Sequence, residues 1–370
     1  MKKILDIVSY RYLPSISGGQ KSIALFLEYL GVASELYVAG TKNNDNSRIK
    51  HYKPLSFLSK NPISYIDFWA WIKIRKFILK NEIKTVIVEH PYIGWMGVLL
   101  KFTLNIQLIF HTHNIEYLRF KSLGKWWWKI MKYYEYFVLK NADKIFCISQ
   151  EDLDWMTVKM GIQKSKCIVV PYGIVQNTIP LDKEKCKINI CKRYDLDYNK
   201  PLLLFNGLLS YKPNEEALYK ILNEILPRMI EAKFDFNLII AGKGLNQALN
   251  NLESYKGSNV IYTGFVDDID ELFKAADIFI NPVISGGGVK TKLIEALGMN
   301  CTCISTEAGA IGVDKYACSN KLKIVTNNDW SSFVTQIIDS SKLIENIPDV
   351  FYKRYNWRNI IKGILNNEII

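Results

Sequence analysis

A glycine run between an apolar segment and a helical pattern has the clearest chemical potential in this sequence. The apolar run ends at Pro282, Gly286, Gly287 and Gly288 follow, and a helical pattern starts at about Val289. Glycines in such a turn let backbone N–H groups approach a phosphate, and the helix dipole favours an anion there. The segment therefore predicts a phosphate-binding loop, with an ordinary tight turn as the alternative.

The helical pattern after these glycines carries a charged stripe. Gly288, Lys292 and Glu295 are spaced four and three residues apart, so on one helix they would share a face. The stripe would offer an anion cradle, then a cation, then a carboxylate able to accept both hydroxyls of a ribose. We expect a nucleotide diphosphate here, and the competing interpretation is a solvated helix face.

Three further loops follow apolar runs that are typical of short strands. Ligands of open parallel sheets bind outside the carboxyl ends of the strands, so these loops would lie at the same edge as the triple glycine. Any one of them could be a plain turn. The candidate donor-binding residues in these loops are Gly207 with Lys212, Gly242 with Lys243, and Phe265 with Val266.

Two of the four histidines lie in one strand tip, QLIFHTHNIE. In an extended chain His111 and His113 point to the same side, with Thr112 opposite. A metal pair is conceivable, but no third ligand is suggested nearby, so no metal is expected. The alternatives are a histidine satisfied by backbone groups and a functional imidazole. Glu89, at the end of another apolar run, is the carboxylate to examine as a hidden base.

The elements that must position these residues alternate throughout the chain. Short β-rich runs separated by helical patterns such as Glu215–Ala232 and Asp268–Ala276 predict parallel sheets covered by helices, an α/β fold with two doubly wound Rossmann-like domains. The runs expected to be strands are Ile4–Ser9, Ser34–Ala39, Thr85–Glu89, Gln107–His111, Lys144–Ser149, Cys167–Val170, Leu202–Asn206, Asn237–Ala241, Val260–Thr263, Ile278–Asn281, Cys301–Ser305 and Lys323–Val325.

We place the domain boundaries from proline content and apolar periodicity. Residues 1–170 form an N-terminal domain, 171–200 a linker, and 201–354 a C-terminal domain. A helix at about 355–370 is expected to pack back onto the first domain.

Charge is divided unevenly between the two halves. Residues 1–170 hold 25 Lys and Arg against 13 Asp and Glu, so they carry the whole net charge of +12. Within them, Lys121–Lys140 mixes lysines with aromatic residues, a composition suited to the headgroup zone of an anionic membrane. Ile130, Tyr134, Phe137 and Val138 have the helical spacing of a core face. The residues expected to meet a membrane or a lipid-linked acceptor are Trp126, Trp127, Trp128, Lys129 and Lys132.

Two other interpretations of this charge stay open. RNA could be bound by the same composition, although no recognised nucleic-acid motif is present and no nucleic acid is expected. An uneven surface without a partner is the second.

The seven cysteines form no CxxC pair, and no signal peptide or long apolar span is evident. We therefore expect a cytoplasmic protein, peripheral on the inner face of the cytoplasmic membrane.

Several of these motifs together resemble family-four retaining glycosyltransferases, which have the GT-B fold, with two Rossmann-like domains facing each other across a cleft. The similarity covers nearly the whole chain. A subgroup with a GGG…K..EA donor loop and an F.G…Y.PN phosphate strand is most similar. The residues that carry the resemblance are Gly18-Gly19, His113-Asn114-Ile115-Glu116, Val170-Pro171-Tyr172-Gly173, Phe205-Asn206-Gly207, Tyr211-Lys212-Pro213-Asn214, Gly286-Gly287-Gly288, Lys292 and Glu295-Ala296-Leu297.

The resemblance implies roles for individual residues. Glu295 matches the second Glu of the family's E-x7-E motif and should hold the ribose. His113 should approach the donor sugar, with Asn114 and Glu116 positioning it, while Gly18 and Gly19 should face the phosphates. Such enzymes need no metal.

Two departures from the family pattern concern the donor site. The first Glu of the motif falls at Gly287, which puts the donor sugar in doubt. Leu208 stands where the family has an arginine, while Lys212 approximates the accompanying lysine. Lys292 or Lys290 is expected to supply the lost positive charge, because the diphosphate needs compensation in a low-dielectric cleft.

The resemblance implies transfer of a sugar from a UDP- or GDP-sugar to a hydroxyl of a glycan or lipid-linked acceptor, in cell-surface polysaccharide synthesis. A nucleotide-sugar epimerase or hydrolase of the same fold is one alternative. A membrane-associated scaffold with a vestigial nucleotide site is another. A dinucleotide oxidoreductase is disfavoured because no intact GxGxxG followed by an acidic residue is present.

Overall fold

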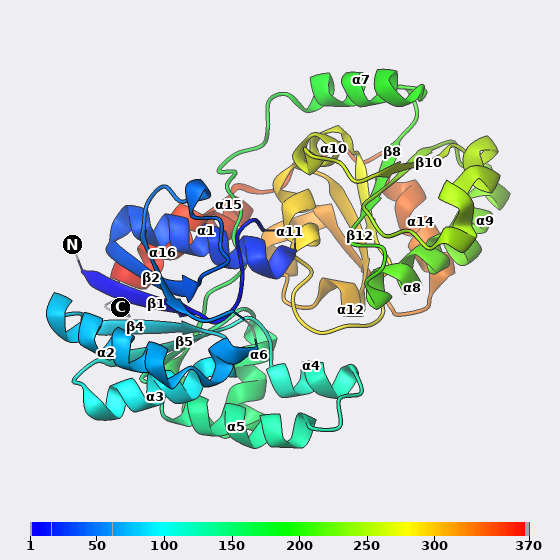
Figure 1. Ribbon diagram of the computed structural model, residues 1–370. Helices are drawn as coiled ribbons and strands as arrows, with labels where there is room; N and C mark the ends of the chain where they lie inside the picture. Colours follow the sequence, from blue (N-terminus) through cyan, green and yellow to red (C-terminus); the bar gives the residue numbers. More distant parts are fainter. Residues whose placement is uncertain (1, 16, 61, 367–369) are drawn as a thin grey trace. The chain divides into compact units, whose positions relative to one another are not determined.

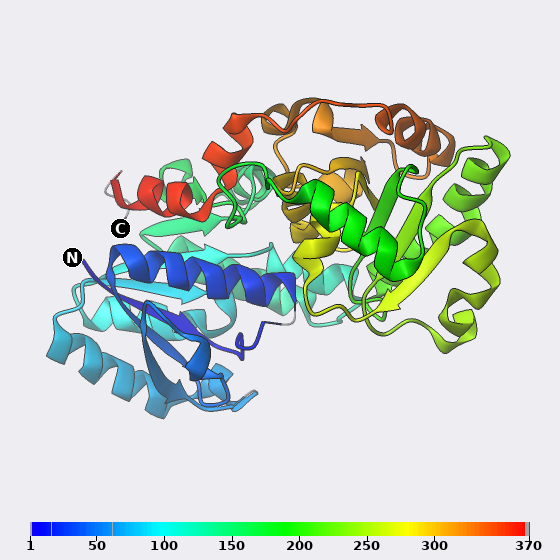
Figure 2. The same cartoon turned by 90° about the horizontal axis from the view of Figure 1, so that it is seen from above.

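The computed structural model describes residues 2–15, 17–60, 62–366 and 370. The chain divides into two compact units, drawn in Figures 1 and 2. Unit 1 comprises Met1–Gly173, Gly287–Val289 and Trp357–Ile370, and unit 2 comprises Ile174–Gly286 and Lys290–Asn356. The stretch 174–200, which we expected to be linker, is therefore part of unit 2, where its helix α7 (Lys183–Tyr194) packs against α10 (Ile269–Ala275).

Unit 1 is built on a parallel sheet with the strand order β3-β2-β1-β4-β5-β6-β7 in the described residues. The order reverses direction between β1 and β4, so the loops after these two strands leave the sheet at its topological switch point. The strands are β1 (Lys3–Val8), β2 (Glu35–Thr41), β3 (Lys53–Leu58), β4 (Thr85–Glu89), β5 (Gln107–Thr112), β6 (Lys144–Cys147) and β7 (Cys167–Val169).

Alternation of apolar side chains along these strands builds two cores. Leu5, Val86 and Leu108 face one side, where α2, α3 and α5 cover the sheet. Ile4, Ile87 and the residues in register with them face the other side, covered by α1 and α16. The helices of unit 1 are α1 (Gly18–Ala33), α2 (Phe68–Asn81), α3 (Gly94–Thr103), α4 (Glu116–Ser122), α5 (Trp128–Lys140), α6 (Gln150–Asp154) and α16 (Trp357–Asn366).

The C-terminal helix belongs to unit 1. Trp357 is fully buried, lies edge-on to Phe26 and Tyr172, and packs so closely against Gly173 that a Cβ there would come within 2.4 Å of the indole. Of the expected helix at about 355–370, residues 367–369 lie outside the described part of the chain.

Unit 2 repeats the same architecture. Its parallel sheet has the order β10-β9-β8-β11-β12-β13 in the described residues, so its switch point lies between β8 and β11. The strands are β8 (Leu202–Asn206), β9 (Asn237–Ala241), β10 (Val260–Gly264), β11 (Ile278–Asn281), β12 (Thr302–Thr306) and β13 (Leu322–Val325).

Helices cover both faces of this sheet as well. One core joins the strands to α8, α9 and α14, while α10 and α11 lie on the opposite face (Figure 1). The remaining helices are α8 (Lys212–Lys220), α9 (Leu226–Glu231), α11 (Thr291–Gly298), α12 (Glu307–Ala310), α13 (Lys315–Cys318), α14 (Trp330–Ser340) and α15 (Asp349–Tyr355). The short helical segments of the chain are η1 (Asn46–Arg48), η2 (Ile63–Ile66), η3 (Pro91–Ile93), η4 (Trp155–Lys159), η5 (Lys164–Lys166), η6 (Ile221–Ile225), η7 (Gln247–Ser258) and η8 (Ser319–Lys321).

Besides α7, the structure departs from the expected elements at three further places. Strand β3 was not foreseen, because it is an edge strand with few buried side chains and a proline at Pro54. The helix expected over Glu215–Ala232 is divided into α8 and α9, which are joined by the wider helical turn η6. Helix α11 begins at Thr291 rather than at about Val289. Among the described residues, no helix has both the length and the apolar character required to cross a bilayer.

Candidate functional site

Each sheet gathers polar residues at its own switch point. In unit 1 the strands that meet there are β1, β4 and their neighbour β5, and in unit 2 they are β8 and β11. Since the carboxyl ends of parallel strands share one edge, the loops after them bring together residues far apart in sequence.

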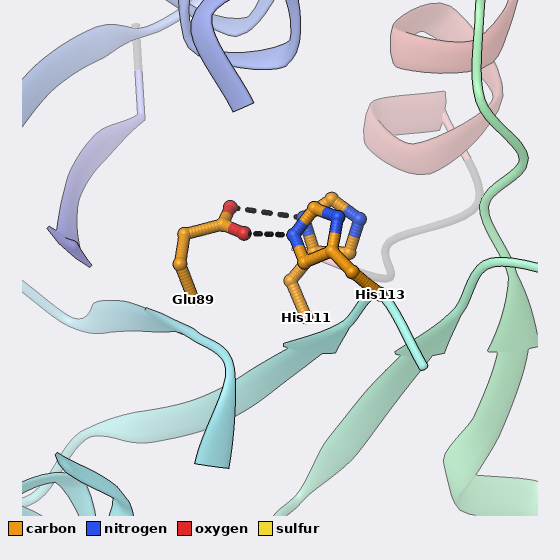
Figure 3. Close-up of side chains that lie close together, drawn as sticks. All are labelled: Glu89, His111 and His113. Carbon is orange, nitrogen blue, oxygen red and sulfur yellow. Dashed lines mark hydrogen bonds and ion pairs between the residues drawn. The ribbon is translucent and has the colours of Figure 1, made fainter. Parts of the chain in front are cut away.

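The unit 1 cluster centres on the carboxylate of Glu89. Both of its oxygens are used: the His111 Nδ1 lies 2.9 Å from Oε1, and the His113 Nε2 makes a still closer contact with Oε2 (Figure 3). The register of the sheet explains this arrangement, because β4 and β5 pair with Glu89 directly opposite His111. His113 lies two residues further on the same side, as the period of an extended chain predicts, while Thr112 bonds to the Phe146 carbonyl.

A second carboxylate lies next to this group. Glu116, the first residue of α4, accepts hydrogen bonds from the Tyr92 hydroxyl at 2.6 Å and from Arg119 at 2.8 Å. His90 stacks on the His113 ring at 4.4 Å between centroids, and its Nε2 lies 2.8 Å from the Tyr10 hydroxyl. We expected Glu116 and Asn114 to orient His113. Glu116 instead bonds to Tyr92 and Arg119, Asn114 lies 3.4 Å from Glu116, and Glu89 holds His113.

Burial and charge set the protonation states of this cluster. Burial opposes ionisation of Glu89, but His111 and His113 outweigh it and lower the pKa of Glu89. At Glu116 the hydrogen bond and charge of His90 likewise overcome burial, so its pKa falls to about 2. Burial lowers the pKa of His113, helped by the neighbouring His111, which favours the neutral imidazole.

A third carboxyl group, that of Asp6, belongs to the same cluster. It is fully buried on the neighbouring strand β1, and burial together with the negative charge of Glu89 raises its pKa. The carboxyl group of Asp6 is therefore expected to carry its proton while Glu89 is charged.

The His113 Nδ1 is one of the buried polar atoms of this cluster without a hydrogen-bond partner in the described part of the chain. The others are the two carboxyl oxygens of Asp6 and the His90 Nδ1, which lies 3.3 Å from the Glu116 Oε1. A buried nitrogen without a hydrogen bond costs about 1–3 kcal/mol. Such a cost is typical of sites that are completed by a ligand.

Among the described residues, Glu89, His111 and His113 also form a set whose ligand atoms could converge on a metal, because these atoms lie within 4.8 Å of one another. Glu89 is thus the third candidate ligand that the sequence did not reveal. The two contacts to Glu89 are, however, hydrogen-bond contacts, whereas two ligands about 2.0–2.2 Å from one ion in tetrahedral arrangement lie further apart. We therefore assign protons to these contacts.

In unit 2, the loops after β8 and β9 are in close contact. Gly242 has φ +136°, and a Cβ there would lie 1.8 Å from the Gly207 carbonyl oxygen, so glycine is required. Backbone hydrogen bonds fasten the two loops, from the Gly207 N–H to the Ala241 carbonyl and from the Leu209 N–H to the Lys243 carbonyl. These glycines therefore shape the edge of the sheet beside the switch point.

Lys292 of α11 reaches this edge. Its Nζ donates to the Asn206 carbonyl at 2.9 Å and to the Asn214 Oδ1 at 3.0 Å, and it lies 4.6 Å from the centre of the Phe205 ring. All of these partners are neutral, and Lys292 forms no ion pair among the described residues. Burial, and to a smaller extent the charge of Lys290, lowers the pKa of Lys292 to about 7.

Lys290 is the residue directly before α11. Its Nζ donates to the Gly286 carbonyl at 3.1 Å, and burial lowers its pKa to about 8. The triple-glycine turn therefore carries two lysines whose charges are destabilised by burial. The negative charges of a bound diphosphate would favour the charged forms of both lysines and so raise their pKa values.

The other residues expected in this site are arranged differently. Lys212 is mostly exposed and lies 3.9 Å from the Glu216 carboxylate, so Lys292, not Lys212, reaches the end of β8. Gly288 precedes α11, so the expected stripe reduces to Lys292 and Glu295 on the helix itself. At the neighbouring loop Lys243 lies 5.9 Å from the ring centre of the exposed Phe265, which precedes Val266.

The expected glycine loop near the N-terminus is the first turn of α1. Gly18 and Gly19 are its first two residues, and the Ser17 side chain caps the helix by accepting from the Gln20 N–H. The two glycines therefore form a helix entry, and the first N–H groups of the helix have no partner within it.

The basic aromatic segment forms the end of α4 and all of α5. Trp126 is 82% exposed, Lys129 and Lys132 are exposed, and Trp127 and Trp128 pack partly against the core. Ile130 and Phe137 were expected in the core but are 63% and 48% exposed. The buried face of α5 is formed by Met131, Glu135, Val138 and Leu139, so the helix is rotated relative to our expectation.

The two parallel-sheet units, each with the order of a doubly wound fold, define a GT-B protein. Solved structures of this fold include sucrose-phosphate synthase from Thermosynechococcus elongatus, with a TM-score of 0.72 and 16% identity, covering 100% of this chain and 99% of that one. Anabaena HepE in complex with UDP has a TM-score of 0.73 and 15% identity, covering 100% of both chains.

Family models match both units. The model "Glycosyltransferase Family 4" matches residues 18–176, and "Glycosyl transferases group 1" matches residues 200–342. The chain belongs to the glycosyltransferases of this family-four, GT-B type.

Relatives agree with that assignment. An uncharacterized glycosyltransferase of Methanocaldococcus jannaschii is 23% identical over 98% of this chain and 97% of its own length. The UDP-Gal:alpha-D-GlcNAc-diphosphoundecaprenol alpha-1,3-galactosyltransferase of Escherichia coli is 22% identical over 74% of this chain and 70% of its own length.

Proposed function

We propose that this glycosyltransferase is a retaining enzyme that moves a sugar from a UDP- or GDP-sugar to a hydroxyl of a glycan or lipid-linked acceptor in cell-surface polysaccharide synthesis. The observation that carries the donor assignment is the buried, unpaired charge of Lys292 beside the triple-glycine turn. An anion with two charged phosphates compensates such a site, which neutral amides and carbonyls cannot do. The UDP bound to Anabaena HepE and the UDP-Gal in the name of the Escherichia coli relative support the same choice.

In the proposed reaction, the bond between the anomeric carbon and the phosphate oxygen breaks through an oxocarbenium-like state. The acceptor oxygen bonds to the same face of the anomeric carbon, and its proton passes to the departing phosphate oxygen. Glu89 and Glu116 are engaged with histidine, tyrosine and arginine partners, which supports the phosphate oxygen as the proton acceptor. Glu89 is therefore a hydrogen-bonding group in our proposal rather than the hidden base considered above. No metal takes part.

The donor assignment is tested by thermal unfolding with UDP, GDP and ADP. A nucleotide at 100 times its dissociation constant should stabilise the protein by about 2.7 kcal/mol. If Glu295 holds the ribose, Glu295→Ala removes this stabilisation, whereas Glu231→Ala, an exposed position at the end of α9, keeps it. Stabilisation by none of the three nucleotides would contradict the proposal. Stabilisation without turnover of any nucleotide-sugar would favour the alternative function, a membrane-associated scaffold with a vestigial nucleotide site.

We also propose that unit 1 binds an anionic membrane surface through two neighbouring exposed groups. One consists of Trp126, Ile130 and Tyr133 near the start of α5. The other consists of the exposed side chains at η2 and the start of α2, Ile63, Ile66, Phe68 and Trp69.

Trp95 links these two groups. Its indole donates to the Tyr65 carbonyl and its backbone N–H to the Tyr134 hydroxyl, so η2 and α5 lie against the same helix, α3. Exposed aromatics next to lysines favour the headgroup region of an anionic bilayer. This attachment would place the protein on the inner face of the cytoplasmic membrane.

Vesicle co-sedimentation tests the membrane proposal. Binding should require phosphatidylserine in phosphatidylcholine vesicles, weaken with salt, and fall in a Trp126→Ser, Ile130→Ser double variant. Tyr316→Ser is the matched control, because Tyr316 is an exposed aromatic beside a lysine in unit 2. Equal binding by both variants would contradict the assignment of this surface.

A further inference from the structure

We propose that Glu89 is a positioning residue that fixes His113 in the tautomer with the proton on Nε2, so that the free Nδ1 accepts a hydrogen bond from a sugar hydroxyl. This inference rests on the proposed function for the identity of the ligand. Its structural part, the tautomer, stands on the contacts within unit 1 alone.

The tautomer follows from the use of both oxygens of Glu89. An ionised carboxylate only accepts hydrogen bonds, so both imidazoles must donate to it. His111 then carries a proton on Nδ1 and His113 carries one on Nε2. In a neutral His113 the remaining nitrogen, Nδ1, has a lone pair and no proton.

The surroundings separate the roles of the two histidines. The centre of the His111 ring lies 4.5 Å from that of Phe26 and 5.8 Å from that of Phe146, so His111 has two apolar aromatic neighbours. His113 instead stacks on His90 and leaves its Nδ1 buried without a partner in the described chain. Its open nitrogen makes His113 the member of the pair that is poised for a ligand.

The chemistry of the open nitrogen selects the ligand group. A lone pair on Nδ1 attracts a hydroxyl proton and disfavours a phosphate oxygen, which only accepts. Burial lowers the pKa of His113 and so supports the neutral form. If His113 were doubly protonated, Nδ1–H would instead donate to a phosphate. The two possibilities predict opposite partners, a sugar hydroxyl or the diphosphate.

Nitrogen-15 NMR of histidine-labelled protein without ligand measures the tautomer directly. The two-bond correlations of His113, assigned by their loss in His113→Asn, should show a protonated Nε2 and a non-protonated Nδ1 at pH 7.5. A proton on Nδ1, alone or together with Nε2, overturns the proposal. This measurement does not depend on folding of a Glu89 variant.

A second variant tests the role of Glu89. A glutamine can accept from one imidazole but must donate to the other, so Glu89→Gln should switch the tautomer of His111 or of His113. Tyr10→Phe, which removes the hydroxyl 2.8 Å from the His90 Nε2, is the matched control and should leave both tautomers unchanged. Unchanged histidine spectra in folded Glu89→Gln would overturn the positioning role.

The two proposals fail in different ways. The expected tautomer in a protein that turns over no nucleotide-sugar would leave this inference standing and remove the transferase proposal for the ligand. Turnover of a nucleotide-sugar by a protein whose His113 carries its proton on Nδ1 would overturn this inference and leave the transferase proposal standing.

Discussion

Lys292 should take up a proton when the protein binds a nucleotide diphosphate. Burial lowers its pKa from the ordinary value of 10.5 to about 7 in the free protein. At pH 8 about nine in ten molecules would therefore hold Lys292 uncharged. A diphosphate within reach of Nζ favours the charged form and raises this pKa, so binding at pH 8 should draw a proton from the solvent.

The size of the effect follows from the two lysines at the turn. Restoring the pKa of Lys292 to its ordinary value corresponds to about 5 kcal/mol of interaction between the charge and the ligand, at 1.36 kcal/mol per unit of pKa. Lys292 should take up about 0.9 proton per nucleotide at pH 8. Lys290, with a pKa of about 8, should add up to about 0.5.

Isothermal titration calorimetry with UDP or GDP in two buffers of different ionisation enthalpy measures this uptake. Lys292→Arg keeps a charge that does not titrate near pH 8, so the uptake should fall by about 0.9 proton per nucleotide. Lys212→Arg is the control, since Lys212 is mostly exposed and lies beside Glu216. Equal proton uptake by the wild-type protein and Lys292→Arg would refute the placement of the diphosphate at Lys292.

Four further outcomes follow from the same structure. Between about pH 7 and pH 10.5 the unfolded chain holds more protons at Lys292 than the folded protein does, so the free energy of unfolding should rise with pH in that window. In chemical denaturation, the free energy of unfolding of Lys292→Met should depend less on pH than that of the wild-type protein. Gly242→Ala should lower the free energy of unfolding by more than about 2 kcal/mol, because its Cβ would collide with the Gly207 carbonyl; a smaller loss in urea denaturation would contradict the close approach of these loops. Trp357→Ala should cost about 3–5 kcal/mol in the same assay, since the indole is fully buried in unit 1. His113→Ala should keep the nucleotide-dependent thermal shift and impair transfer, and equal loss of both would mean that its role is structural.

The sequence by itself determined the two α/β domains and most of their strands. Buried parallel strands need continuous apolar runs, and such runs at Thr85–Glu89 and Leu202–Asn206 coincide with β4 and β8. The edge strand β3 left no such signal, because few of its side chains are buried. The spacing of His111 and His113 likewise foretold that both point to one side, since the period of a strand is fixed by its backbone.

The tertiary structure decided which residues form hydrogen bonds with these side chains. Glu89 lies 22 residues before His111 in sequence, and only the pairing of β4 with β5 places it opposite that histidine. The partners of Lys292 come from β8 and the start of α8, about 80 residues away, while the nearer candidate Lys212 remains mostly exposed. Spacing along one strand or helix can be read locally, whereas strand order and register bring distant segments together and so fix hydrogen bonds, burial and protonation.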